Sequence, residues 1–380
     1  MSRNPVQHMR QPSIGAASRI YSRENVGRYA ERARQRRRSR RIRRALVSTF
    51  IILLLCTGSA LAITVVKSII NGSLHGSSGY LSGLAGILTD ANAARDPFNI
   101  LLLGTDGRPG ETTYRSDSII LAHVDPVKKT AALISIPRDT AVEYKGETMK
   151  INETHAYGGP EAVVTAVRDL TGSNIAYYAE VSFTGLESLV DAVGGIDITV
   201  PEGDEVDDPQ AGDMSIPAGS QHMDGATALT FSRARHQFAD GDYTRMRHQR
   251  MVLGALAHKI LNGLEITQIP ALLESLSNML ITTMDVDDIV GVVTAMRGMD
   301  TSNIWSANLP SYTGADTFVD GKSYVFVYKD ALREMMERVE AGEDPKGPNT
   351  SGKGGTSTTL GDLNTRNNLS WANSGDDTPE

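Results

Sequence analysis

The clearest hydrophobic pattern of the chain lies in three short runs that follow one another closely. The first run, Ile100 to Leu103, is apolar throughout, whereas the next two, Ser118 to Val124 and Thr130 to Ile136, alternate apolar and polar positions. Alternation with a period of two is typical of strands that bury one face, and the Asp125-Pro126 dipeptide between the last two runs is a turn signal. The pattern therefore predicts a strand followed by a β-hairpin.

Strands and helices alternate along most of the remaining chain. Apolar spacing typical of helices recurs, for example after Pro160, which suits a first helical position. Helices are expected over residues 80–88, 160–172, 185–193, 224–231, 243–261, 269–280, 286–299 and 329–339, and further strands over 175–183, 196–200, 303–309 and 324–328. This order predicts an α/β fold, a layered α/β/α domain with a central mixed β-sheet.

One segment is apolar without any period. Leu46 to Val66 contains no charged residue over 21 positions, which is long enough for a helix to span the hydrocarbon core of a bilayer. A cleaved signal peptide is the alternative, because Ala60-Leu61-Ala62 resembles a cleavage site, but the long segment before it argues against cleavage. We therefore expect a basic cytoplasmic arm (1–44), a transmembrane helix (45–67), an extracellular stalk (68–97), a main folded domain (98–340) and a disordered low-complexity tail (341–380).

The net charge of −7 hides a strong asymmetry. Residues 1–44 hold 14 Arg and no Lys against Glu24 and Glu31, a net charge of +12, so the rest of the chain carries −19. Basic residues before a transmembrane helix favour a cytoplasmic N-terminus, which makes this a single-pass protein of the cell membrane with residues 68–380 outside. The arm lacks a folded helix-turn-helix pattern, so we expect contact with anionic membrane lipids and no nucleic acid as a partner. Cys56 is the sole cysteine and lies within the span, so the outer part has no disulfide.

The loop after the first strand carries candidate metal ligands. Asp106 and Asp117 flank this glycine-containing loop, and Arg138 follows the second hairpin strand. If the three strands lie side by side, these polar ends meet at one rim of the sheet. Two carboxylates with an arginine beside them suit a divalent cation that bridges to phosphate oxygens.

A second polar stretch collects arginines near a helix start. Arg233 and Arg235 alternate, so they point the same way in an extended chain, and Asp242 can cap a long helix that carries Arg245 and Gln249 four residues apart. A helix N-terminus favours anions, and guanidinium groups bind phosphate oxygens in pairs. The stretch predicts a phosphate or pyrophosphate site. The alternative is that these arginines pair with surface acids.

An acidic loop between the two stretches has a less specific pattern. It holds Glu202, Asp204, Glu205, Asp207 and Asp208, but it lacks the glycine and the terminal glutamate of a calcium-binding loop. We expect a solvated surface loop and no calcium site.

Taken together, these segments resemble the LytR-CpsA-Psr family of Gram-positive cell-wall enzymes. The resemblance covers residues 98–262 and rests on seven segments in order behind a single membrane span: NILLLGTDGR, RSDSIIL, ISIPRDT, KINETHAYGGPEA, LVDAVGGIDI, DGATALTFSRARH and GDYTRMRHQR. It implies a transferase that moves a glycopolymer, such as teichoic acid, from a polyprenyl-pyrophosphate lipid carrier to a muramic acid hydroxyl of peptidoglycan, forming a phosphodiester. The implied partners are the lipid-linked glycopolymer, peptidoglycan and membrane lipids.

The resemblance also assigns roles to residues. It implies Mg²⁺, with Mn²⁺ as the alternative ion, on Asp106 and Asp117. It implies pyrophosphate contacts and catalytic roles at the positions already identified: pyrophosphate binding by Arg138, Arg233, Arg235, Arg245 and Gln249, and catalysis by Arg138, Asp242 and Arg245. Whether Asp242 acts as a base or orients Arg245 stays open at this point.

Two positions depart from the family pattern. His248 stands where an arginine is more frequent, which predicts a weaker or pH-dependent phosphate contact, and His155 replaces a frequent aromatic residue near Lys150. A polyprenyl chain also needs an apolar slot, for which the helices over 160–171 and 244–261 are candidates.

Three alternative functions use part of the same pattern. A polyprenyl-pyrophosphate hydrolase would need the same residues with water as the acceptor. A membrane-anchored regulator of cell-wall assembly would need a sensing outer domain, and a wall-binding module without activity would not need two acids placed for a cation.

Overall fold

The computed structural model describes most of the chain beyond residue 63. The described residues are 64–76, 79–106, 115–276, 279–313, 317–319, 321–346 and 357–359. The chain divides into the units Met1–Val66 and Lys67–Glu380, and all elements below belong to the second.

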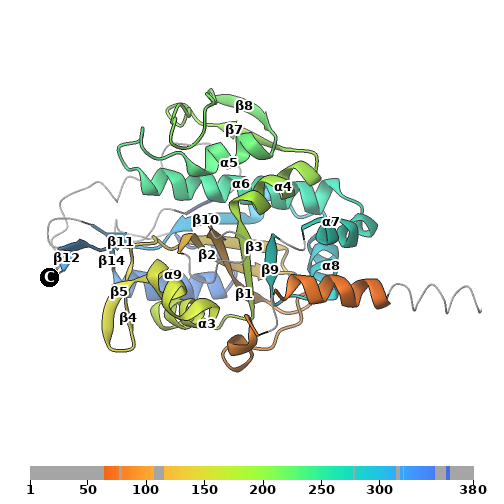
Figure 1. Ribbon diagram of the computed structural model, residues 1–380, viewed down its shortest axis with the longest axis horizontal. Coiled ribbons are helices and arrows are strands. Elements are labelled where there is room, and N and C mark those ends of the chain that lie inside the picture. The colour runs from red at the N-terminus through yellow and green to blue at the C-terminus, as the bar shows by residue number, and fades with distance from the viewer. Residues whose placement is uncertain are drawn as a thin grey trace, which may run out of the picture. The chain divides into compact units, whose positions relative to one another are not determined.

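A seven-stranded mixed sheet forms the centre of this unit (Figure 1). Its order is β15-β10-β3-β2-β1-β6-β9. The strands are β1 (Phe98–Thr105), β2 (Ser116–Asp125), β3 (Thr130–Ser135), β6 (Tyr177–Ser182), β9 (Leu280–Thr282), β10 (Ile304–Asn308) and β15 (Ser357–Thr359). The pairs β1–β6 and β3–β10 are parallel and the other neighbours antiparallel. The predicted α/β fold with a mixed sheet and the predicted hairpin are confirmed.

The two hairpin strands carry apolar residues at successive positions and bury side chains on both faces, instead of the single buried face that alternation predicted. Leu101 and Ile119 face one cluster, with helices α3 (Ile151–Thr171) and α9 (Lys329–Glu340), whereas Ile100 and Ile120 face the other, with α6 (Asp242–Gly263) and α8 (Val286–Met296). Helices α3 and α9 lie below the sheet in Figure 1, and α4 (Phe183–Ala192), α5 (Gly225–Arg233) and α6 lie above it.

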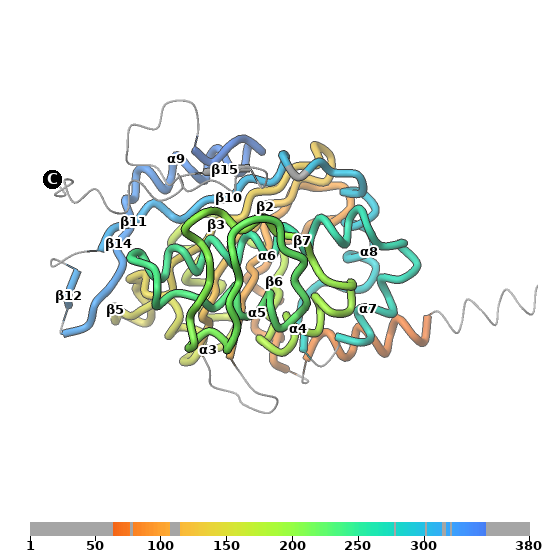
Figure 2. Tube along the Cα trace, turned by 90° about the horizontal axis from the view of Figure 1, so that it is seen from above, coloured from red at the N-terminus to blue at the C-terminus, as the bar shows by residue number. Residues whose placement is uncertain are grey.

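The helices are α3 (Ile151–Thr171), α4 (Phe183–Ala192), α5 (Gly225–Arg233), α6 (Asp242–Gly263), α7 (Ile269–Leu276), α8 (Val286–Met296) and α9 (Lys329–Glu340), with short 3-10 turns η1 (Ser82–Gly86), η2 (Ile266–Gln268) and η3 (Thr301–Asn303). Small ribbons are β4 (Ala141–Tyr144) with β5 (Glu147–Lys150), β7 (Ile196–Val200) with β8 (Gly219–Met223), β11 (Ser311–Tyr312) with β14 (Phe326–Val327), and β12 (Phe318–Val319) with β13 (Lys322–Ser323). The β7–β8 ribbon packs over α4–α6 through a third apolar cluster and forms an outer layer (Figures 1 and 2).

Residues 67–74 are helical and pack against the rest of the second unit. Ile70 and Leu74 are buried in the apolar cluster of α8, and the Asn71 side chain accepts a hydrogen bond from the Val286 backbone N–H. Within the described residues no helix combines the length and the apolar character needed to cross a bilayer. The predicted span Leu46–Val66 lies outside the described residues except for its last three.

Several boundaries differ from the sequence prediction. Helix α3 begins at Ile151 instead of Pro160, because the chain kinks at Gly159 (φ 63°) and continues helically on both sides. Asp242 is the first residue of α6 and Gly241 its cap, and Arg233 is the last residue of α5 instead of part of an extended segment. Strand β15 lies within the segment predicted as a disordered tail and pairs with β10.

Candidate functional site

One polar pocket gathers nearly all the predicted site residues. It has a volume of about 750 Å³, and its described wall consists of Asp106, Asp117, Arg138, Phe183, Gln210, Ser232, Arg233, Arg235, His236, Arg245 and Gln249. The ends of β1 and α5, the starts of β2, α4 and α6 and the segment after β3 deliver these side chains to one end of the sheet. The segments that the sequence placed at one rim therefore meet in space, and they meet the arginine stretch there.

Asp242 is not part of the described pocket wall, but it contacts three arginines of that wall. Its Oδ1 is 2.8 Å from Arg245 Nη2 and 3.6 Å from Arg235 Nη1, and its Oδ2 is 3.8 Å from Arg138 Nε. Both carboxylate oxygens are therefore engaged by guanidinium groups. The geometry favours orientation of the arginines over proton transfer as the role of Asp242.

Arg138 also binds the second predicted metal ligand. Its Nη1 donates a 2.6 Å hydrogen bond to Asp117 Oδ1, and Arg245 Nη2 donates to the Asp117 backbone oxygen at 3.4 Å. Burial alone would lower the pKa of Arg138, but Asp242 and Asp117 raise it, whereas burial dominates at Arg245 and lowers its pKa. Both guanidinium groups are thus held in fixed positions beside the pocket.

Several buried polar atoms of the wall lack a hydrogen-bond partner among the described residues. They are Nε of Arg138, Nε of Arg245 and Oε1 of Gln249. A buried donor or acceptor without a hydrogen bond costs about 1–3 kcal/mol, so such atoms in a native pocket indicate a bound ligand or water. Two of the three atoms are cationic donors, which suit an anionic ligand.

Arg233 completes the positive wall in a different way. No carboxylate contacts it within the described part of the chain, and its guanidinium lies 5.3 Å from the centre of the Phe183 ring. A cation stacked on an aromatic face keeps its N–H edges available for other acceptors. The alternative that these arginines pair with acids holds for Arg235 and Arg245, which contact Asp242, but no such pair involves Arg233 among the described residues.

The two predicted metal ligands suit a magnesium ion whose other coordination positions are filled by water and by oxygens of the substrate. Among the described residues no group of three or more His, Cys, Asp or Glu side chains gathers as a ligand set. Asp106 and Asp117 nevertheless line the same pocket as the arginines, and only Oδ1 of Asp117 is bonded to Arg138. Mg²⁺ commonly takes one or two carboxylates and fills its other positions with water and phosphate oxygens. The two carboxylates of Asp106 and Asp117 match this usual coordination of Mg²⁺.

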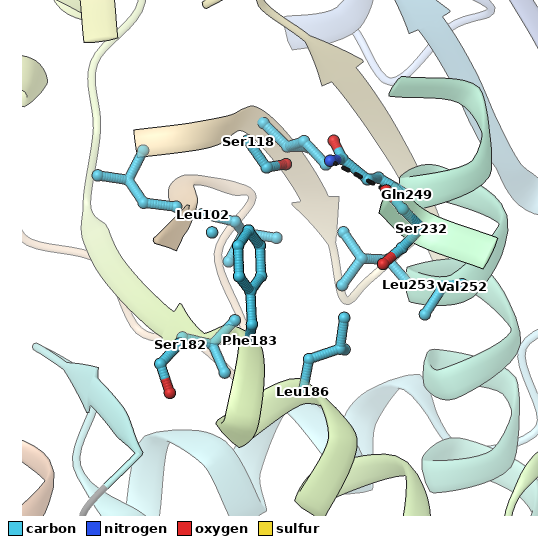
Figure 3. A pocket seen from close by; sticks show the side chains of 13 residues that line it. Leu102, Ser118, Ser182, Phe183, Leu186, Ser232, Gln249, Val252 and Leu253 are labelled. Carbon is cyan, nitrogen blue, oxygen red and sulfur yellow. Dashed lines mark hydrogen bonds between the residues drawn. The ribbon is translucent and has the colours of Figure 1, made fainter. Parts of the chain in front are cut away.

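Two small apolar chambers continue from the polar pocket between the sheet and the helices above it. The first, of about 60 Å³, shares Phe183, Ser232 and Gln249 with the polar pocket, and the second, of about 160 Å³, reaches α7. Figure 3 shows the Phe183 ring standing in the first chamber opposite Leu253, with Gln249 bonded to the Ser232 backbone oxygen. Helix α6 lines both chambers, as predicted. Helix α3 does not, because it packs on the opposite face of the sheet.

The acidic loop differs from the solvated loop that we expected. Asp204 and Asp208 are buried, at 2% and 3% exposure. Asp204 pairs with Arg247 and lies 3.5 Å from His248 Nε2. Asp208 accepts hydrogen bonds from the backbone N–H groups of the segment after α5. Burial opposes its charged form, but these bonds lower the pKa of Asp208 to about 2. The loop thus anchors the arginine segment.

His248 does not contribute a phosphate contact. It is fully buried, its Nδ1 lies 3.0 Å from the Phe231 carbonyl oxygen, and its ring stacks on that of Phe231 at 3.9 Å. Burial lowers the pKa of His248, although Asp204 opposes the shift. The predicted pH-dependent phosphate contact is wrong, since the imidazole faces the third apolar cluster.

His155, the second position that departs from the family pattern, also has a structural role. His155 is buried beside Glu180 at 3.5 Å, and Lys150 pairs with Asp139 at 3.0 Å. Neither His155 nor Lys150 is part of the described pocket wall.

Four residues of the pocket wall were not predicted from the sequence: Phe183, Gln210, Ser232 and His236. His236 directly follows the arginine segment, so its neighbours provided a signal. Gln210 comes from the acidic loop, and nothing in its local sequence indicates contact with the pocket.

Comparison with known proteins places the chain among relatives. The profile of the LytR_cpsA_psr family matches residues 80–341. Biofilm regulatory protein A of Streptococcus mutans is 30% identical over 272 residues, which cover 66% of this chain and 65% of the relative. The polyisoprenyl-teichoic acid–peptidoglycan teichoic acid transferase TagV of Bacillus subtilis is 30% identical over 258 residues, which cover 64% and 63%. Both matches thus span slightly less than two thirds of the relative.

A solved structure has the same architecture. The structure described as TagT bound to LIIa-WTA is 26% identical and superimposes with a TM-score of 0.57, covering 67% of this chain and 93% of that chain.

Proposed function

Because this chain belongs to the LytR-CpsA-Psr family, we propose that it transfers a glycopolymer from a polyprenyl-pyrophosphate carrier to a muramic acid hydroxyl of peptidoglycan, forming a phosphodiester. One relative is named as a teichoic acid transferase acting on peptidoglycan. The observation that carries the proposal is the pocket wall, in which four arginines and two aspartates converge at one end of the sheet.

The arginines supply what the reaction needs at its phosphorus centres. Attack on a pyrophosphate increases the negative charge on the leaving phosphate, and positive groups that are already in place stabilise that charge. Arg138 and Arg245 are oriented by Asp242, and the Nε–H group of each has no hydrogen-bond partner among the described residues. Arg233 and Arg235 line the wall beside them. We assign the four to the two phosphates of the donor.

Asp106 and Asp117 would hold Mg²⁺, with Mn²⁺ as the alternative. When bound, the ion neutralises phosphate charge and polarises phosphorus–oxygen bonds. Arg138 fixes the orientation of the Asp117 carboxylate through the 2.6 Å hydrogen bond.

The apolar chambers suit the polyprenyl tail. They adjoin the polar pocket at Phe183 and Gln249 and extend between α4, α6 and the sheet towards α7. A lipid that enters them places its pyrophosphate at the arginines. Helix α7 and the helix of residues 67–74 lie on the same side of the molecule in Figures 1 and 2. The proposal includes a single-pass protein whose N-terminus is cytoplasmic and whose catalytic domain faces the outside.

The proposal is tested by analysing the products of the full-length protein in lipid vesicles. The donor is a synthetic polyprenyl-pyrophosphate-linked oligosaccharide, the acceptor is an uncross-linked peptidoglycan strand, and products are identified by mass spectrometry. Transfer yields a muropeptide that has gained the oligosaccharide phosphate, together with polyprenyl monophosphate. Release of the oligosaccharide phosphate into water alone would instead establish a hydrolase. An untouched donor would contradict the proposal.

A further inference from the structure

His236 forms a hydrogen-bonded pair with Asp208 at the edge of the polar pocket. Its Nδ1 lies 3.1 Å from Asp208 Oδ2, the same oxygen that accepts the backbone N–H groups of Arg235 (3.1 Å) and His236 (3.0 Å). The Asp208 side chain is 2% exposed, whereas that of His236 is 41% exposed and belongs to the pocket wall. One end of the imidazole is therefore fixed inside the protein and the other is accessible.

This arrangement determines which nitrogen can accept a proton. A carboxylate can only accept, so Nδ1 of His236 carries the hydrogen and Nε2 keeps its lone pair. An aspartate that holds an imidazole in one tautomer and stabilises its protonated form is the recurring companion of a histidine base. The backbone hydrogen bonds of Asp208 keep its carboxylate in place when the imidazole becomes charged.

The other acids that the structure describes in or beside the pocket wall already have assigned partners. Asp242 contacts three guanidinium groups, and Asp117 is bonded to Arg138. Asp106 is assigned to the metal. Among the described residues of the pocket wall, His236 then offers a nitrogen lone pair, at Nε2, that no carboxylate or guanidinium group engages.

We propose that His236 is the general base of the transfer and that Asp208 is its positioning residue, an inference that rests on the proposed function. Nε2 takes the proton of the muramic hydroxyl as that oxygen forms its bond to the phosphorus carrying the glycopolymer. The bond from this phosphorus to the bridging oxygen breaks, and its electron pair leaves with polyprenyl phosphate. The imidazolium then returns its proton to water.

Removal of the base should slow turnover without weakening donor binding. General base catalysis contributes about 10²- to 10⁴-fold, so His236→Ala should lower kcat at least about a hundredfold. Donor affinity, measured with the same lipid-linked oligosaccharide in vesicles, should stay within about threefold, because the arginine wall is intact. Added imidazole should restore part of the turnover of His236→Ala, and Asp208→Asn should give an intermediate loss of kcat.

A second histidine–aspartate pair is the matched control. His222 Nδ1 lies 2.7 Å from Asp197 Oδ1 on the β7–β8 ribbon, outside the pocket wall. His222→Ala should transfer like the wild type, with no response to imidazole. If His236→Ala retains turnover within threefold, or loses donor binding in parallel with turnover, the base assignment is wrong. Failure of the wild type to transfer at all would instead contradict the proposed function.

Discussion

Helix α6 carries arginines in two contrasting environments within two turns. Arg245 faces the polar pocket, where its Nε lacks a hydrogen-bond partner among the described residues. Arg247 and Arg250 point into the protein and are 2% exposed. Arg247 forms a two-point pair with Asp204, and Arg250 donates to Ser135 and Asn308, each at 2.6 Å, and to Ser306.

The difference separates a binding arginine from a structural one. Both kinds are buried, so burial alone does not identify the site. Arg250 joins β3 and β10 to α6 through neutral partners, and burial together with repulsion from Arg247 lowers the pKa of Arg250 to about 9. Within the described part of the chain, Arg245 forms an ion pair with Asp242, and its Nε has no hydrogen-bond partner. The informative property is hydrogen-bonding capacity that the protein itself leaves unused.

The largest expected effect is the loss of turnover when Asp117, an acid of the pocket, is removed, compared with removal of Asp204, the buried partner of Arg247. Asp117→Ala should reduce magnesium-dependent turnover by about a thousandfold or more, because the ion supplies several kcal/mol of charge stabilisation. Unfolding of this variant should remain cooperative, since Asp117 is partly exposed. Asp204→Ala should instead destabilise the fold by leaving Arg247 buried without its partner. Turnover with and without EDTA, together with thermal melting, distinguishes the two. Full activity in EDTA would remove the metal from the mechanism.

The second effect concerns the structural arginine. Arg250→Met should lower the free energy of unfolding by about 3 kcal/mol or more, since it leaves the polar groups of Ser135 and Asn308 buried without a donor. Arg245→Met, on the same helix, should change it by less than about 1 kcal/mol. Urea unfolding of both purified variants is the measurement. Equal free energies of unfolding for the two variants would contradict the assignment of Arg250 as a structural arginine and Arg245 as a binding one.

The third effect concerns the pocket arginines themselves. Arg233→Ala and Arg245→Ala should each weaken donor binding or turnover about ten- to a hundredfold, since a charged hydrogen bond is worth about 1.5–3 kcal/mol. Lysine at either position should recover only part of this, because an ammonium cannot bind two oxygens in parallel. Arg297, which ends α8 near Glu265, is the control. If the Arg233 variant behaves like Arg297→Ala, Arg233 does not contact the pyrophosphate.

The smallest effect is a pH dependence of stability at Asp208. Its folded pKa of about 2 lies below the unfolded value of about 3.9, so the folded state favours the charged form. The stabilisation is present above pH 4 and is lost as the pH falls through about 2. The stability difference between the wild type and Asp208→Asn should therefore shrink by about 2 kcal/mol between pH 5 and pH 2. Asp197→Asn, at an exposed site, should show no such change. A constant difference for Asp208→Asn would contradict the low pKa.

Local sequence predicted the elements whose pattern is regular. The strands of the hairpin were recognisable from their short apolar runs on either side of the Asp125-Pro126 turn signal, although successive apolar residues in both strands bury two faces and not one. Helix α3 was predicted too short, because the sequence Gly158-Gly159-Pro160 is typical of a helix break. The helix instead continues through these residues, with Gly159 alone in a non-helical conformation at positive φ. Asp242 is a good cap by residue type, yet it begins the helix and binds arginines instead.

The polar contacts across the chain were less predictable. Asp204 and Asp208 look solvated in their own loop, and their partners lie some 30 to 40 residues away in the sequence. His248 and Gln249 are neighbours, but only Gln249 faces the pocket, since adjacent helical positions point in different directions. Such distinctions depend on how the elements pack, which no local pattern contains.

The position of Asp242 among three guanidinium groups gives the arginines of the pocket an internal counter-ion. Its single negative charge does not balance three guanidinium groups, so net positive charge remains for a ligand. A pyrophosphate brings more negative charge and more oxygens to these arginines than a monophosphate does. We therefore expect the proposed pyrophosphate donor to bind more tightly than a monophosphate, while Asp242 keeps the arginines in position in both cases.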